Sequence, residues 1–232
     1  MSASEVLDIP PVDPTDKRGR ILDAALETFS AYGFSRTSMA EIAKAAEMSR
    51  PALYLHFANK QEIFRAALER ILDRAYENGQ SELAASKLAG RKRPEQESAI
   101  AAQLTEYLQR FHGDLMEVFT ETMHGDDFLA AEHSQATEIL EAAARRSRNG
   151  LTRYFSELQK VGAFEPERSG QPAARWVELI LLSPRGFKQD KPGVTLYRKR
   201  LKTLAIAVAA GMSGASKHQR TSSKRLRRKS GS

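Results

Sequence analysis

Three signals for the start of a helix follow one another between residues 38 and 62. Ser38 and Glu41 have the spacing of a capping box, in which each side chain accepts a hydrogen bond from the other residue's backbone amide. Ser49 is a helix cap followed by Pro51, which suits a first helical turn because the amides there have no helical acceptor. We therefore expect two short helices joined by a tight turn, the arrangement called a helix-turn-helix.

Longer helices flank this pair. Apolar residues recur with helical spacing from Ile21 to Phe29, ahead of Gly33, and the helix that Asn59 caps continues to about Gly79. Helical spacing also dominates the rest of the chain, where we find no useful length of the alternation that is typical of strands. The sequence thus predicts an all-α protein with about nine helices.

The positive charge of the chain is concentrated at its end. The 232 residues carry a formal net charge of +7, and seven basic residues with no acidic one follow Met212. The chain before this tail is neutral overall, so the basic balance does not by itself make the folded body a nucleic-acid binder. We expect the tail to be disordered, serving either as a solubilising end or as an arm that neutralises phosphates beside a DNA site.

Several classes of function lack the residues that they need. The chain has no cysteine, which excludes disulfides, cysteine-ligated zinc and thiol nucleophiles. It shows no signal peptide and no long apolar stretch, so we expect a cytoplasmic protein without membrane contact. The motifs of phosphate-binding loops, serine hydrolases and zinc proteases are missing, and the histidines and carboxylates fit no metal ligand set. We expect neither an enzyme nor a cofactor nor a metal site.

The residues around the turn also carry a family resemblance, which extends from about Lys17 to Phe64. This segment resembles the N-terminal signature of the TetR family of bacterial transcriptional regulators at Thr37, Ser38, Ile42, Ala43, Ala46, Ser49, Leu53, Tyr54, His56, Phe57, Lys60 and Ile63. The resemblance implies a three-helix DNA-binding domain followed by a larger helical domain that binds a small molecule and dimerises. It further implies a repressor that leaves a palindromic operator when this effector binds.

The resemblance also implies which residues contact DNA. The second helix of the pair enters the major groove, where Arg50 is suited to guanine, and Pro51 and Ala52 to a thymine methyl group. The other implied contacts, to phosphates or the adjacent minor groove, are Arg36, Thr37, Ser38, Ser49, Tyr54, His56 and Lys60.

One residue of the turn departs from the family pattern. Glu47 stands where the family usually has glycine, and a left-handed turn residue other than glycine costs roughly 1 kcal/mol. A carboxylate beside DNA also disfavours binding. A second hypothesis therefore stays open, namely a helical small-molecule sensor or carrier that has lost specific DNA binding. A third is a general nucleic-acid compactor that acts through the basic tail.

Composition and the resemblance together divide the chain into four parts. Residues 1–16 hold three prolines and four acids and are expected to form a disordered arm. Residues 17–62 correspond to the DNA-binding domain, residues 63–212 to the ligand-binding and dimerisation domain, and residues 213–232 to the basic tail.

The larger domain should hold two further functional surfaces. The candidates for an apolar ligand pocket are Tyr107, His112, Met116, Phe119, Met123, Phe155 and Trp176. The resemblance implies a homodimer through the last two helices of the body. Their apolar faces comprise Trp176, Val177, Leu179, Ile180 and Leu182 in one helix, and Leu201, Leu204, Ala205, Val208 and Ala209 in the other.

Overall fold

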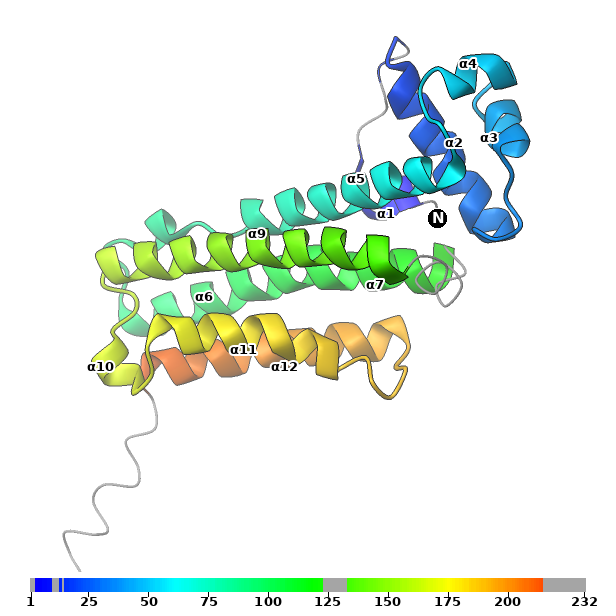
Figure 1. The fold of residues 1–232 in the computed structure, drawn as a ribbon. Helices are drawn as coiled ribbons and strands as arrows, with labels where there is room; N and C mark the ends of the chain where they lie inside the picture. Colours follow the sequence, from blue (N-terminus) through cyan, green and yellow to red (C-terminus); the bar gives the residue numbers. More distant parts are fainter. Residues whose placement is uncertain (1–2, 10–12, 14, 123–132, 215–232) are drawn as a thin grey trace, which may run out of the picture.

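The computed structural model describes residues 3–9, 13, 15–122 and 133–214, and within these ranges every regular element is a helix. This confirms the all-α class. Figure 1 shows a small group of helices, α2 to α4, at one end of a larger bundle of long helices. The helices are α1 (Ala3–Val6), α2 (Lys17–Tyr32), α3 (Met39–Ala45), α4 (Arg50–Tyr54), α5 (Lys60–Ser81), α6 (Arg93–Leu108), α7 (Asp114–Glu117), α9 (His133–Lys160), α10 (Pro166–Ser169), α11 (Ala173–Gly186) and α12 (Val194–Ser213).

Aromatic packing holds the small N-terminal group together. The ring of Phe34, in the loop after α2, lies 5.4 Å from the Phe29 ring and 5.0 Å from the Phe64 ring, measured between centroids. All three side chains are buried, which ties α2 to the first turn of α5. Helix α2 ends where expected, at Gly33, whose φ of +79° suits a glycine.

Helix α5 leaves this group and runs along the bundle, as Figure 1 shows. It continues two residues beyond Gly79, where the sequence pattern predicted its end. A side chain at Gly79 would come within 3.1 Å of Phe111 Cβ, so this glycine permits a close helix approach rather than ending a helix. Gly150 of α9 lies against the end of the Gln80 side chain of α5, so an added Cβ there would require that side chain to move. Helix α9 accordingly runs through Asn149 and Gly150 without interruption.

The segment after α6 stays helical through Gly113. Two π-helical turns, η2 (Gln109–Gly113) and η3 (Val118–Thr122), enclose α7. A Cβ at Gly113 would lie 2.6 Å from the Arg198 guanidinium of α12. Arg198 instead donates to Asp114 at 2.9 Å and to Glu117 at 2.6 Å, joining α12 to α7. Burial raises the pKa of Asp114 in spite of this ion pair.

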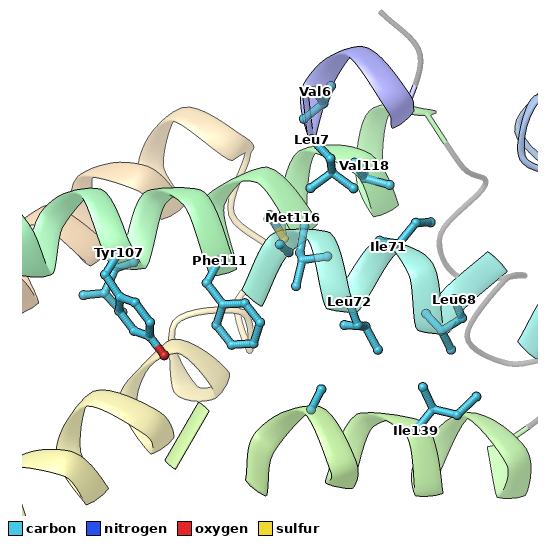
Figure 2. Packing of buried hydrophobic residues seen from close by; sticks show 14 of the residues in the cluster. Val6, Leu7, Leu68, Ile71, Leu72, Tyr107, Phe111, Met116, Val118 and Ile139 are labelled. Atoms are coloured by element: carbon cyan, nitrogen blue, oxygen red, sulfur yellow. The ribbon is translucent and has the colours of Figure 1, made fainter. Parts of the chain in front are cut away.

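The N-terminal arm is ordered over residues 3–9, which corrects the expectation of a disordered segment from 1 to 16. Val6 and Leu7 are buried, and Figure 2 shows both beside Val118 of η3. Asn78 donates to the Leu7 carbonyl at 2.7 Å, and Arg74 donates twice to the carbonyl of the next residue, at 3.0 and 2.6 Å. Asn78 and Arg74 lie far along the chain from the arm. The spacing of apolar residues within the arm therefore could not predict this contact.

The two C-terminal helices bury most of the apolar residues that were assigned to a dimer interface. Val177, Ile180, Leu201, Leu204, Ala205, Val208 and Ala209 all lie in the core of this single chain, because α11 packs on α9 and α12 packs on α6. Helix α11 also includes Pro184 and Gly186, two residue types that commonly end helices. Large apolar side chains that do remain exposed on these helices are Leu179, Leu182, Leu196 and Ile206. None of the described helices combines the length and apolarity that crossing a lipid bilayer requires.

Candidate nucleic-acid interface and internal cavity

The turn between α3 and α4 is closed by backbone hydrogen bonds. The Met48 amide donates to the Ala43 carbonyl at 3.0 Å, and the Glu47 amide donates to the Lys44 carbonyl at 3.2 Å. This pair of bonds defines a Schellman motif, whose second-to-last residue takes a left-handed conformation. Glu47 occupies that position with a φ of +54°, as the sequence indicated. Met48 packs partly on the core, so the turn is fixed in spite of the strained residue.

Helix α4 presents one face to solvent. Ser49 caps it by accepting the Ala52 amide at 3.3 Å, while Leu53 is buried in the domain core. Arg50 and Pro51 are exposed, and Ala52 is half-buried. Beyond them Tyr54 is 48% exposed and Leu55 is 86% exposed. The sequence interpretation missed Leu55. Leu53 and Phe57 are core residues one helical turn apart, and Leu55, which caps the end of α4, lies between them on the outer side.

The start of α3 is held by the predicted capping box. The Ser38 amide donates to the Glu41 carboxylate at 2.7 Å, and the Glu41 amide donates back to Ser38 Oγ at 3.3 Å. Hydrogen bonds from Ser38 lower the pKa of Glu41. Thr37 is buried, and its hydroxyl donates to the Gly33 carbonyl at 2.9 Å. This corrects its expected role, because a buried and engaged hydroxyl is not available to a phosphate. Arg36, next to it, is exposed.

The Lys60 side chain is committed inside the domain. Its Nζ donates to the carbonyls of Phe34 at 2.9 Å, Ser35 at 3.2 Å and Thr37 at 2.9 Å, which uses the three hydrogens of an ammonium group. The same atom lies 4.6 Å from the centre of the Phe34 ring. Lys60 was expected to contact a phosphate; it instead fixes the loop that leads into α3.

Two further arginines that sequence reasoning missed hold the domain in a similar way. Arg20 of α2 donates to the Ala46 carbonyl at 3.1 Å, which anchors the end of α3. Arg18 donates to the His56 carbonyl at 3.3 Å and lies 4.1 Å from the centre of the Phe57 ring. The bond from Arg18 involves the backbone of His56. The His56 side chain is half-buried. Cations from α2 and α5 therefore hold the backbone before α3, at the end of α3 and after α4.

A cavity of about 530 Å³ lies in the body between α5, η2, α7, α9 and α11. His112 and Phe119, two of the expected pocket residues, line it. Tyr107 and Met116 are buried beside it without lining it, and Tyr107 is hydrogen-bonded to Ser147 of the cavity wall. Figure 2 shows Tyr107 and Met116 near Phe111, which does line the cavity.

The other expected pocket residues lie elsewhere. Phe155 packs on Phe164, with ring centroids 5.5 Å apart, and Trp176 covers Gly211 of α12. Phe155 belongs to the buried core and Trp176 is partly buried against it, and neither lines the cavity, which corrects their assignment to a pocket. Met123 lies outside the described residues.

The first comparison with known proteins concerns this N-terminal group. The model of the family described as "Bacterial regulatory proteins, tetR family" matches residues 21–67. The helix-turn-helix region belongs to the TetR family. The chain is 40% identical over 57 residues to the transcriptional repressor ComR of Escherichia coli, and 43% identical over 58 residues to the transcriptional activator FasR of Mycolicibacterium smegmatis. Each alignment covers 25% of this chain, and 27% and 26% of the relatives.

TetR-family structures extend the likeness to the whole fold. A TetR-family regulator candidate from Mesorhizobium loti superposes with a TM-score of 0.61 at 16% identity, over 86% of this chain and 98% of its own. A TetR/AcrR-family regulator from Thermobifida fusca superposes with a TM-score of 0.52 at 19% identity, over 83% and 97%. The matched sequence spans about a quarter of the curated relatives, so the likeness beyond α5 is one of fold.

We expect Glu47→Gly to raise the melting temperature by roughly 2–4 °C, because glycine adopts the left-handed conformation of this TetR-type turn without steric strain. DNA affinity should stay unchanged or improve, since a carboxylate is also removed. Lys191→Gly is the matched control, because Lys191 has a φ of +48° in a loop of the C-terminal half. Both variants should gain stability in thermal unfolding, and a large loss of DNA affinity in Glu47→Gly would contradict this account of the turn.

Proposed function

We propose that the protein regulates transcription, most simply as a repressor, by binding a palindromic operator as a homodimer that a small-molecule effector releases. The observation that carries this proposal is the exposed face of α4 in a TetR-type domain whose turn and flanking loop are fixed from inside. Such a helix can enter the major groove without reorganising. A role on DNA places the protein in the cytoplasm. In this proposal residues 17–62 form the DNA-binding domain, and residues 63–212 bind the effector and the partner subunit.

The exposed residues divide by chemistry into two kinds of contact. Arg50 has the forked guanidinium that binds guanine through two hydrogen bonds, and Pro51 and Leu55 offer apolar contact to a thymine methyl group. The phosphate contacts are assigned to Tyr54 and Arg36, with further contributions from His56 and Ser49. Ser38 is left out, because its amide and its hydroxyl both donate to the Glu41 carboxylate. Phosphate contacts fix the position of the protein on DNA, whereas base contacts select the sequence.

The homodimer is assigned to the exposed leucines and isoleucine of α11 and α12. Leu179, Leu182, Leu196 and Ile206 are between 43% and 50% exposed in a single chain, and apolar side chains grouped on two neighbouring helices favour burial against a second copy. A two-fold dimer would place its two α4 helices about one DNA turn apart, roughly 34–36 Å.

The release step is assigned to α5. This helix begins next to α4 and contributes Leu72 to the cavity wall, so one rigid element connects the two sites. An effector that fits the cavity better when α5 is displaced would shift the equilibrium away from the arrangement that binds DNA.

We expect Arg50→Ala to weaken binding to the best operator by about 1–3 kcal/mol and to relax base preference. Tyr54→Ala should weaken binding to all duplexes about equally, because it removes a phosphate contact. The measurement is selection of bound sequences from a random pool, followed by affinities for the selected and scrambled duplexes. Arg153→Ala, at an exposed position of α9, is the control and should leave both quantities unchanged. Equal affinity of the unaltered protein for all duplexes would instead favour the sensor or carrier without specific DNA binding.

A further inference from the structure

We propose that the cavity between α5, α9 and α11 binds an amphipathic anion, a molecule with an apolar chain and a single anionic head group. The inference deepens the effector part of the proposed function and rests on it only for the consequence of binding. Binding itself concerns residues of the body alone.

The walls of the cavity are mainly apolar. Leu72 of α5, Leu115 of α7, Phe111 and Phe119 of the π-helical turns and Leu181 of α11 all line it. The volume of about 530 Å³ lies within the range of small-molecule sites, roughly 300–1,000 Å³. A wall of this kind accommodates an alkyl chain or a similar apolar group.

The mouth of the cavity is cationic. Four basic side chains line it, Arg145, Arg148, Arg185 and Lys188, together with one carboxylate, Glu141. Arg145 pairs with Glu141 at 3.7 Å.

The other three cations of the mouth form no ion pair with a residue that the structure describes. Arg148, Arg185 and Lys188 are all exposed, and Lys188 lies 5.3 Å from the centre of the Tyr197 ring. Three positive charges without a carboxylate partner, gathered at the rim of an apolar cavity, favour an anion there over a neutral or cationic group.

A single imidazole marks the polar end of the cavity. His112 stands in the π-helical turn η2, and its Nε2 is shielded from solvent without a hydrogen-bond partner among the described residues. Burial, together with the smaller effect of the nearby charges of Lys188 and Arg185, lowers the pKa of His112 to about 3. The imidazole is therefore neutral and lies close to these two cations. A buried polar atom without a partner is costly, and a ligand head group held by Lys188 and Arg185 would supply one.

The experiment is calorimetric titration of the full-length protein, without DNA, with four ligands that share a ten-carbon chain. They are decanoate, decyl phosphate, decanol and decyltrimethylammonium. We expect at least one anion to bind about tenfold more tightly than decanol, because several exposed charges each add a modest attraction. The comparison of decanoate with decyl phosphate identifies the head group. Raising the salt concentration from about 0.05 to 0.5 M should weaken the anion and leave decanol unchanged, since exposed charges are screened.

Substitutions test whether the basic residues at the mouth of the cavity cause the preference for an anion. Arg185→Gln combined with Lys188→Gln should bring the anion to within about threefold of decanol, whereas Arg153→Gln, at an exposed arginine of α9 outside the cavity, should preserve the tenfold difference. Equal binding of decanol and both anions, preference for the cation, or failure of all four ligands to bind would overturn the proposal. Because no DNA is present, those outcomes leave operator binding standing, and a protein that binds an anion without binding DNA would refute only the regulatory role.

Discussion

Leu179→Glu combined with Ile206→Glu is expected to give a folded monomer whose affinity for a two-fold operator falls roughly 10²–10⁴-fold. Both side chains are nearly half exposed in the single chain, at 43% and 49%, so charges there leave the core intact. In a homodimer the same charges would be buried opposite their own copies, without partners. Each subunit would then bind its half-site as a monomer. It would lose the gain in affinity that comes from linking two binding sites in one dimer.

Sedimentation at micromolar concentration measures the oligomeric state, and titration of a two-fold duplex measures affinity. The control is Leu140→Glu, which places the same charge at a leucine of α9 that is 38% exposed and lies outside α11 and α12. It should remain a dimer. A monomeric unaltered protein, or a double variant that stays dimeric, would show that α11 and α12 do not form the interface.

Lys60→Ala is expected to destabilise the protein by about 3 kcal/mol, a fall in melting temperature of roughly 6–12 °C. The substitution removes three charge-assisted hydrogen bonds and leaves the carbonyls of Phe34, Ser35 and Thr37 without this donor. DNA affinity should fall for all sequences alike, because the loop that sets the position of α3 loosens.

Lys44→Ala is the matched control, since Lys44 is exposed in the last turn of α3. It should change the melting temperature little. Thermal unfolding and the salt dependence of DNA binding together decide between the two roles of Lys60. If Lys60→Ala unfolds at the normal temperature while the salt slope falls by about 0.9, the ammonium neutralises a phosphate and the internal role is wrong.

Local chemistry explains which parts of the fold could be predicted. The caps at Ser38 and Asn59 and the stop at Gly33 depend on residues within four positions, so the sequence alone indicates them. Gly79 and Gly150 could not be interpreted locally. Gly79 leaves room for a neighbouring helical segment, and Gly150 lies against the Gln80 side chain of α5. Both contacts exist only after the bundle has assembled.

The exposed face of α4 could also be predicted from local sequence spacing. The period of α4 separates Leu53 from the outward-facing Arg50 and Tyr54. Lys60 was not predictable, because its acceptors are backbone carbonyls 23 to 26 residues earlier. Nor does spacing distinguish Phe119, which lines the cavity, from Phe155, which packs in the core. That difference depends on how α9 lies against its neighbours.

The ordered N-terminal arm has a consequence for the energetics of switching. Helix α1 contacts both α2 of the N-terminal helix-turn-helix group and η3 of the larger bundle, and Asn78 and Arg74 donate hydrogen bonds to the carbonyls that follow it. The arm thus contacts helices on both sides of the junction between the N-terminal group and the larger bundle. In the proposed release step, a ligand that displaces the helix-turn-helix group must either move this arm with it or break the contacts of the arm. If the contacts break, the observed affinity of the ligand is lower than its intrinsic affinity by the free energy needed to release residues 3–9.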